Sequence, residues 1–357
     1  TFAARQTITM SHAIDPYLTS EIPGIGGRIR VTPEDFRVEE LPLYLPCGTG
    51  EHLYIKVTKR LLSTPDLIKL ISNTTGLKAK AIGTAGLKDA RAVTTQMLSL
   101  HLATPDQVAR LKTNEHLLSI EILGRHRNRL RAGHHAGNRF RLVIRDVAAH
   151  AASSIPEILR LLSQRGVPNY FGPQRQGREG KNYRIGAALL NDATRRSSMS
   201  RAKRLWYLNA FQAHLFNRIL ARRIDSLDRV LPGDWAVKVS TGACFQVEDA
   251  AKEQTRAARF EISPTGILFG SRASWADGEP GRIEEAAVAE SGMTKEILTQ
   301  AAKACGFRGE RRALRVPLND LEWSLDGSVL TLGFTLSPGA YATNVLRELM
   351  KTERPQL

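Results

Sequence analysis

Residues 139–145, RFRLVIR, decide the fold of this sequence. The apolar side chains of Phe140, Leu142 and Ile144 alternate with positions that are mostly arginine. This period is typical of a β-strand with one buried face, because successive side chains of a strand point to opposite sides. We therefore expect a strand with one face in the core and a basic face open to a polyanion such as RNA.

Helix and turn signals flank this strand in the sequence. Two segments begin Thr-Pro-Asp, which predicts helices with N-caps at Thr64 and Thr104. Apolar side chains recur at helical spacing in residues 154–166 and 205–224, so both segments should be helices that cover a core. The Asp-Gly pair at 326–327 lies between two alternating stretches and predicts a β-hairpin.

Composition narrows the classes of protein to which the chain can belong. It has 357 residues, 42% of them hydrophobic, which is enough for two domains. Its 51 Lys and Arg exceed its 35 Asp and Glu by 16, an excess typical of a nucleic-acid partner. Cys47, Cys244 and Cys305 stand far apart, so we expect neither a disulfide framework nor a zinc site, and a cytoplasmic location. No run of 18 apolar residues occurs, so we predict no membrane span.

Several familiar signatures are absent or incomplete. The glycines at 24–27 follow no clear strand, and Gly180-Lys181 is followed by Asn182 instead of Ser or Thr. We therefore predict no nucleotide cofactor, and we rank a methyltransferase low for the same reason. The neighbouring histidines at 126, 134 and 135 lack the spacing of a metal motif, so we predict no metal.

An arginine-rich stretch covers residues 124–145. No acidic residue occurs in it before Asp146, and uncompensated charge of this kind is costly without a polyanion. A solvated face is the alternative, but we favour contact with RNA. The arginines predicted to bind RNA, together with two in a later loop, are Arg125, Arg127, Arg129, Arg131, Arg139, Arg141, Arg175 and Arg178.

Two further segments contain side chains suited to chemistry on a nucleotide. Residues 169–178 combine adjacent aromatics, amides, glycines and arginines, which can hold an unstacked base, although a buried aromatic anchor in a turn is the alternative. Residues 83–96 place Asp89 between Lys88 and Arg91 after a run of small residues. A surface ion pair is one interpretation of this pattern. The other is a carboxylate nucleophile kept ionised by neighbouring cations.

Together these segments resemble the TruD family of tRNA pseudouridine synthases. The resemblance rests on four runs in family order: VTPEDFRVEELP from residue 31, GTAGLKDARAVTTQ from residue 83, GVPNYFGPQRQGREGKN from residue 166 and LSPGAYATNVLREL from residue 336. It extends over nearly the whole chain from about Gly24. Two positions depart from the family pattern: Ala90 stands where the family frequently has a basic residue, and Gln176 stands where it usually has Phe.

The resemblance implies roles for particular residues. Asp89 falls on the nucleophile of the family. Phe36, Asn169, Phe171 and Tyr341 fall on positions that contact the target nucleotide, with Phe171 stacked on the uracil. Lys88 and Arg30 are the candidates for the basic partner of Asp89 and for substrate binding; the family often has Lys at the position of Arg30.

The resemblance also implies the fold and the reaction. The expected fold is α+β: a catalytic domain on a mixed, mainly antiparallel sheet from residues 10–194 and 316–357, with a TRUD domain inserted at 195–315. The expected reaction converts uridine to pseudouridine in tRNA, at uridine 13 of the D arm, without a cofactor. Asp89 attacks either C6 of the base or C1′ of the sugar. We expect a monomer. The competing hypothesis is an RNA-binding or RNA-chaperone protein without catalysis.

Overall fold

The computed structural model describes residues 15–177, 180–191 and 198–352. These residues form two compact units, and each is described by itself. Unit 1 contains residues up to 22, 158–317 and 343–348, and unit 2 contains residues 23–157, 318–342 and those from 349 onward. We predicted that residues 195–315 form a domain inserted between the two segments of the catalytic domain. This division of the sequence stays a prediction.

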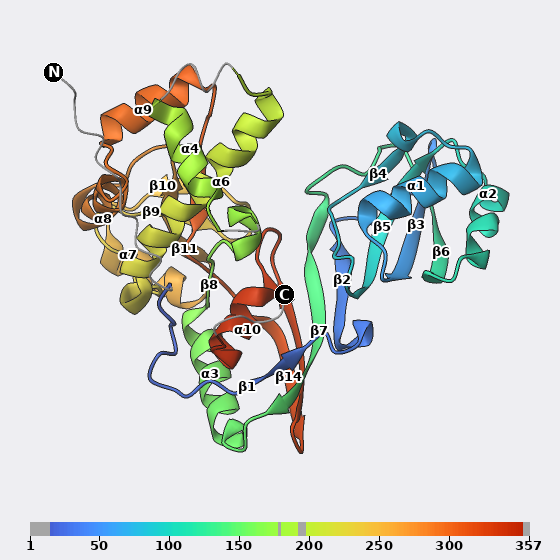
Figure 1. Cartoon of the computed structure of the whole chain (residues 1–357), viewed down its shortest axis with the longest axis horizontal. Coiled ribbons are helices and arrows are strands. Elements are labelled where there is room, and N and C mark those ends of the chain that lie inside the picture. The colour runs from blue at the N-terminus through green and yellow to red at the C-terminus, as the bar shows by residue number, and fades with distance from the viewer. Residues whose placement is uncertain (1–14, 178–179, 192–197, 353–357) are drawn as a thin grey trace. The chain divides into compact units, whose positions relative to one another are not determined.

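Unit 2 is built on one large sheet (Figure 1), which contains nine strands among the described residues. The strand order is β14-β15-β7-β2-β5-β3-β6, while β1 pairs with β7 and β4 pairs with β5. Only β2 and β5 run parallel within this part of the chain, so the sheet is mixed and mainly antiparallel, as predicted. The strands are β1 Gly26–Ile29, β2 Phe36–Pro42, β3 His52–Arg60, β4 Ile82–Thr84, β5 Val93–His101, β6 Leu117–His126, β7 His135–Val147, β14 Asn319–Asp326 and β15 Val329–Leu336.

Strand β7 contains the stretch RFRLVIR and has the predicted faces. Phe140, Leu142 and Ile144 are buried, whereas Arg139 and Arg141 are exposed. Phe140 lies opposite residues of β2 and β15, and its ring stacks on that of Phe334 with centroids 5.3 Å apart. The strand is longer than predicted because the ladder with β2 continues to His135. The predicted hairpin is also confirmed, since β14 and β15 pair across the Asp-Gly turn.

Helix α1 (Thr64–Thr75) covers the β3–β5 part of the sheet, as Figure 1 shows, and buries Leu67 and Ile71 in a shared core. The predicted N-cap, Thr64, was wrong by one residue. The cap is Ser63, whose Oγ accepts the hydrogen bond from Asp66 N. Thr64 is buried and donates to Gln96 instead. The predicted Thr104 cap of α2 (Pro105–Ala109) is confirmed.

Unit 1 packs helices around a second sheet (Figure 1). Helix α6 packs along α4 and buries Phe211 and Leu215 in the core of this unit. The helices of this unit are α4 Asn182–Asn191, α6 Arg201–Arg222, α7 Ala250–Ala258, α8 Gly278–Ala289 and α9 Lys295–Ala304. The strands are β9 Trp235–Lys238, β10 Cys244–Gln246, β11 Ile262–Leu268 and β12 Glu310–Ala313 in one sheet, and β8 Val167–Pro168 with β13 Arg315–Val316 in another.

Two helices contribute residues to both units: α3 (Ala151–Arg165) and α10 (Ala342–Met350). Helix α3 begins three residues before the predicted start at 154. Short 3-10 helices complete the structure: η1 Pro33–Asp35, η2 Ala79–Ala81, η3 Arg110–Thr113, η4 Pro173–Gln176 and η5 Ile224–Ser226. No helix in the described part of the chain is long and apolar enough to cross a membrane.

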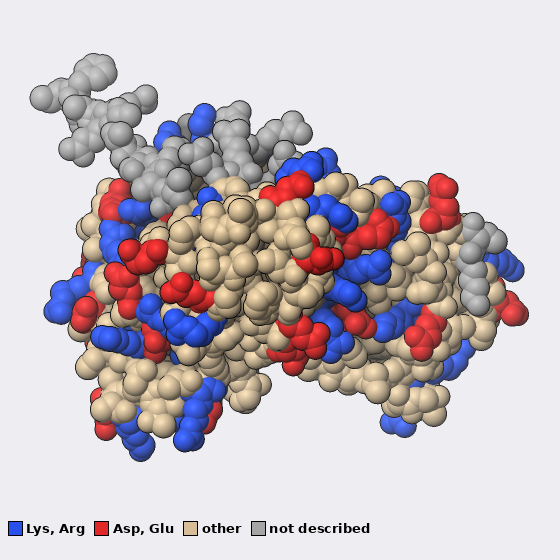
Figure 2. Space-filling view, turned by 90° about the horizontal axis from the view of Figure 1, so that it is seen from below, with Lys and Arg blue, Asp and Glu red and all other residues tan. Residues whose placement is uncertain are grey.

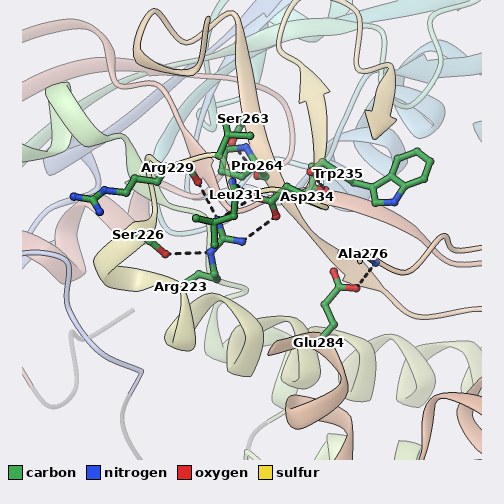
Figure 3. Close-up of polar contacts among 12 residues, drawn as sticks. Arg223, Ser226, Arg229, Leu231, Asp234, Trp235, Ser263, Pro264, Ala276 and Glu284 are labelled. Atoms are coloured by element: carbon green, nitrogen blue, oxygen red, sulfur yellow. Dashed lines mark hydrogen bonds and ion pairs between the residues drawn. The ribbon is translucent and has the colours of Figure 1, made fainter. Parts of the chain in front are cut away.

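Two buried ion pairs in unit 1 support its fold. Arg223 donates to Asp234 at 2.9 Å and to the carbonyl oxygen of Arg229 (Figure 3). Glu284 accepts a hydrogen bond from Ala276 N at 3.0 Å and lies 2.7 Å from Arg311. Buried ions of this kind need partners to offset the loss of water. The pairing of these four side chains favours a structural role for them.

The surface charge is mixed on the face that Figure 2 shows. Figure 2 shows one face of the molecule, on which Lys and Arg are interspersed with Asp and Glu. The excess of positive charge in the sequence therefore does not by itself locate an RNA-binding surface. Individual side chains have to be followed.

Candidate active site

The loop between β4 and β5, residues 85–92, is fixed by hydrogen bonds on both sides of Asp89, and the one after it runs from Leu61 N to Ala92 O at 3.2 Å. Thr64 Oγ1 accepts a hydrogen bond from Lys88 N at 2.9 Å, and Ala85 O accepts one from Gly133 N at 2.8 Å. The small residues before the loop are required by packing: a Cβ at Gly83 would lie 2.4 Å from Leu130 O. The loop therefore presents Asp89 from a firmly held backbone.

Asp89 forms an ion pair with Arg30, which directly follows β1. Arg30 Nη2 lies 2.5 Å from Asp89 Oδ2, and Arg91 N donates to Oδ1 at 3.2 Å. The Arg30 side chain is 11% exposed and that of Asp89 33%, so the carboxylate is the group that solvent or a substrate can reach. Arg30 Nε is buried and has no hydrogen-bond partner among the described residues.

The backbone of Arg30 is unusual. Its φ is +56°, a left-handed conformation that side chains other than glycine adopt at a cost. The guanidinium lies 4.1 Å from the ring centroid of Phe36, which is only 4% exposed. Packing on Phe36 and pairing with Asp89 together compensate for this conformation and fix the position of the guanidinium.

A second, buried ion pair holds the same loop through Lys88, the residue before Asp89. Lys88 Nζ lies 2.7 Å from Glu40 Oε2 and donates to Asn138 Oδ1 at 2.9 Å. Both charged side chains are almost fully buried, at 6% and 1% exposed. Glu40 also accepts a hydrogen bond from Met97 N. Lys88 is therefore committed to Glu40, and Arg30 is the cation on Asp89.

Lys59 is a buried cation behind the same loop. Its Nζ donates to the carbonyl oxygen of Leu62 and, at 3.5 Å, to that of Asp89. Burial lowers the pKa of Lys59 to about 8, although the charge of Asp89 acts in the opposite direction. The ammonium thus ties the backbone of residue 89 to the end of β3.

A second group of predicted residues lies in unit 1, after β8. Asn169 is 4% exposed. Its Nδ2 donates to Ala313 O at 2.9 Å, and its Oδ1 accepts from Arg312 Nη2 at 2.6 Å. The Arg312 guanidinium lies 4.2 Å from the ring centroid of Phe171. Asn169 and Phe171 are thus joined through Arg312.

The backbone of Phe171 is fixed by Asn217 of α6. Asn217 Oδ1 accepts from Phe171 N at 2.9 Å, and Nδ2 donates to Phe171 O at 3.0 Å. The ring meets Phe216 edge to face, with centroids 5.5 Å apart. Arg175, on η4, lies 5.6 Å from the same ring. Phe171 is a partly exposed aromatic on a rigid support.

Comparison with known proteins identifies the family. The family model described as tRNA pseudouridine synthase D (TruD) matches residues 14–200 and 196–349. The chain belongs to the tRNA pseudouridine synthase D family. It is 39% identical to tRNA pseudouridine synthase D of Syntrophotalea carbinolica, over 94% of this chain and 99% of that one. Its identity to the protein of that name from Thermus thermophilus is 42%, over 95% and 92% of the two chains.

A solved structure has the same fold. The putative TruD protein of Methanosarcina mazei superposes with a TM-score of 0.81 and covers 95% of this chain, with 23% identity. The α+β fold class expected from the resemblance is therefore confirmed. The prediction of an isomerase of the tRNA pseudouridine synthase class is confirmed at the level of the family.

Within this TruD-family chain, the structure gathers the predicted site residues into two groups. Arg30, Phe36, Lys88 and Asp89 lie together in unit 2, and Asn169, Phe171 and Arg175 lie together in unit 1. Tyr341, in unit 2, directly precedes α10 and is partly exposed. The catalytic and substrate-binding roles of all these residues stay predictions.

The arginines predicted to bind RNA have different surroundings. Arg125 and Arg129 donate to the carbonyl oxygens of Ala103 and Ile82. The expectation that the stretch 124–145 lacks acidic partners was wrong. Glu39 of β2 lies 3.6 Å from Arg139, and Asp35 lies 2.8 Å from Arg145. Arg127, Arg131 and Arg141 are exposed. Arg178 lies outside the described residues.

Sequence reasoning missed three residues of these TruD-family clusters. Glu40 and Lys59 occupy the buried phase of their strands, continuing Phe36 and Val38 in β2 and Ile55 and Val57 in β3. A charged residue in the inward phase of an alternating strand is a signal for a buried ion, and it was available. Arg312 gave no such signal, because its contact with Asn169 spans 143 positions of the chain. No group of three or more His, Cys, Asp or Glu in the described residues is placed to hold a metal.

Proposed function

We propose that this protein isomerises uridine 13 in the D arm of tRNA to pseudouridine, with Asp89 as the nucleophile. Membership of the tRNA pseudouridine synthase D family supports the reaction class. The single observation that supports the choice of nucleophile is the Arg30–Asp89 pair at 2.5 Å, on a loop in which the neighbouring Lys88 is hydrogen-bonded through its backbone N–H and its side chain.

The reaction needs no external oxidant or acid in its balance. The bond between N1 and C1′ breaks, the uracil turns within the site, a bond between C5 and C1′ forms, the C5 hydrogen leaves as a proton, and N1 takes up a proton in its place. Asp89 either attacks C1′, displaces the uracil as an anion and is itself displaced when C5 bonds to C1′, or it adds to C6 and is expelled when the new bond has formed. Both routes need a carboxylate held in one orientation near the sugar.

Arg30 supplies that orientation. Its guanidinium is fixed by the Phe36 ring and by its own restricted backbone, so it holds Oδ2 while Oδ1 meets the amide of Arg91. Displacing one oxygen toward the substrate leaves the other in its ion pair. The pair thus provides preorganised electrostatic support without a large movement during the reaction.

Substrate binding requires an unstacked base. Flipping a nucleotide out of a folded RNA costs a few kcal/mol, and stacking on an aromatic side chain returns about 1–3 kcal/mol per base. We assign that stacking to Phe171, with the buried Asn169 holding Arg312 beside its ring. The partner is tRNA, bound by a monomer in the cytoplasm.

The test uses a tRNA transcript labelled with tritium at C5 of uridine. Only formation of the C5–C1′ bond releases the label, and the modified position is mapped in the product by reverse transcription after carbodiimide treatment. We expect release from the parent transcript and none from one with cytidine at position 13. Release from both transcripts would refute the assigned position. Tight binding without release from any tRNA would favour an RNA-binding protein without catalysis.

A further inference from the structure

Unit 2 contains a pocket of about 440 Å³ that shares no lining residue with the Asp89 cluster. It lies at the connection between β6 and β7, beside the first residue of β3. The lining residues are His52, Arg127, Asn128, Arg129, Arg131 and His134. The set contains three guanidinium groups and no carboxylate, which is the chemistry of an anion site.

The arginines of the pocket are not neutralised by any acidic side chain that the structure describes. Neither Arg127, Arg129 nor Arg131 forms an ion pair with an acidic side chain among the described residues. This distinguishes them from Arg139 and Arg145, which have partners on β2 and η1. His52 Nδ1 adds a buried polar atom with no hydrogen-bond partner in the described part of the chain.

Hydrogen bonds to residues of neighbouring strands hold the connection between β6 and β7 in place. Tyr54, which is fully buried, donates to Asn128 O at 3.0 Å, and Ser99 Oγ accepts from Leu130 N at 2.9 Å. Arg129 Nη2 donates to Ile82 O at 2.7 Å. A site whose backbone is already ordered loses little entropy when it binds a ligand.

The pocket is also tied to the loop of Asp89. Gly133, in the same connection, donates its backbone N–H to Ala85 O, four residues before Asp89. The connection that lines the pocket is therefore hydrogen-bonded to the loop that carries Asp89. Two anion-binding positions on one strand of RNA fix its register better than one, because each bound phosphate limits sliding.

We propose that this pocket binds a backbone phosphate of the RNA substrate, at a nucleotide other than the uridine that is isomerised. The proposal rests on RNA being the substrate, as the proposed function states. The pocket is a binding determinant and takes no part in the chemical step. Its removal should weaken RNA binding and leave the rate of the bound complex unchanged.

The experiment compares the double variant Arg127→Gln/Arg131→Gln with a control that removes two positive charges elsewhere in unit 2, Lys69→Gln/Lys78→Gln. All four side chains belong to exposed residues, so thermal unfolding should be unaffected. The dissociation constant for a tRNA transcript is measured across salt concentrations, and single-turnover tritium release is measured at saturating enzyme.

We expect the pocket variant to bind about tenfold more weakly or worse, with a salt slope lower by about 0.7–0.9 for each phosphate that the variant no longer binds. Its saturating rate should stay within about twofold of the wild type. The control should change affinity by less than about twofold. Affinity and salt slope equal to those of the control would overturn the proposal.

Two further outcomes distinguish this proposal from the proposed function and from binding of a free anion. If the wild type binds tRNA but isomerises no uridine, the binding measurements still decide the role of the pocket. If inorganic phosphate at millimolar concentration raises the melting temperature of the wild type but not of the pocket variant, while tRNA affinity is the same in both, the pocket binds a free anion. That result would overturn the assignment to RNA.

Discussion

The two clusters of predicted site residues are built from different chemistry. Around Asp89 the contacts are ionic: Arg30 on the carboxylate, and Lys88 on the buried Glu40. Around Phe171 they are an arginine over a ring and hydrogen bonds of two amide side chains. Ion pairs surround the carboxylate that would react, whereas a supported aromatic ring is placed where a base would be held. Substitutions in the two clusters should therefore have different effects.

The largest effect is expected from removal of the cation on Asp89. Arg30→Met should lower the single-turnover rate at saturating tRNA by about 100- to 1000-fold, because a preorganised charge at a reaction centre contributes on that scale. Arg30→Lys should recover part of the rate, since it restores charge without the planar fork. The control is Arg28→Met, whose pair with Asp146 is largely exposed. An Arg30→Met rate within tenfold of wild type would remove Arg30 from the account.

The buried support of the loop should appear in stability. Glu40→Gln leaves the Lys88 ammonium buried without a counter-charge and should lower the free energy of unfolding by about 3 kcal/mol. Its neighbour Glu39 pairs with Lys56 at 2.8 Å, and these side chains are 36% and 37% exposed. Glu39→Gln should therefore cost less than about 1 kcal/mol. Urea unfolding of both variants decides between them, and equal decreases would contradict the distinction.

In the aromatic cluster, Phe171→Leu should weaken turnover of tRNA by about 5- to 100-fold, the range that corresponds to the loss of one stacked base. Phe245 offers a matched control, because it is also partly buried beneath an arginine in unit 1, with Arg256 5.7 Å from its ring centroid. Phe245→Leu should leave turnover unchanged. Measurements of tritium release at subsaturating tRNA give both values. Wild-type turnover by Phe171→Leu would exclude stacking on this ring.

The smallest effect is a pH dependence of stability. The pKa of Lys59 falls to about 8 on folding because of burial, so between about pH 8 and its unfolded value near 10.5 the unfolded chain binds more protons. Lys59 therefore makes the free energy of unfolding rise with pH in this window. From pH 8 to 9.5 wild type should gain about 1–2 kcal/mol relative to Lys59→Met. Lys56→Met, at a partly exposed position of the same strand, should follow wild type, and parallel curves for all three would refute the low pKa.

Much of the fold could be predicted from local patterns, because strand and helix periods and turn residues act over short stretches. The period of RFRLVIR located the faces of β7, and the Asp-Gly turn located the hairpin. The N-cap of α1 was misplaced because Ser63 and Thr64 are both good caps, and the choice depends on the tertiary contact of Thr64 with Gln96.

The candidate site was harder to predict from the sequence than the fold was. Asp89, Arg30 and Phe171 were predicted through the family resemblance, and spacing alone left a surface ion pair as the simpler interpretation of Asp89. Which cation pairs with Asp89 depends on β2, since Glu40 engages Lys88 and leaves Arg30 for the carboxylate. Such long-range choices are made by packing between strands, which no local pattern records.

The most direct test of the central claim is single-turnover tritium release by Asp89→Asn on prebound tRNA. This substitution keeps the size of the side chain and removes the nucleophilic oxygen charge. We predict no release above background, with tRNA affinity within a few-fold of wild type, whereas Asp106→Asn, at an exposed position of α2, releases tritium normally. Release by Asp89→Asn at a rate within about tenfold of wild type would contradict the account, because removal of an essential nucleophile costs far more.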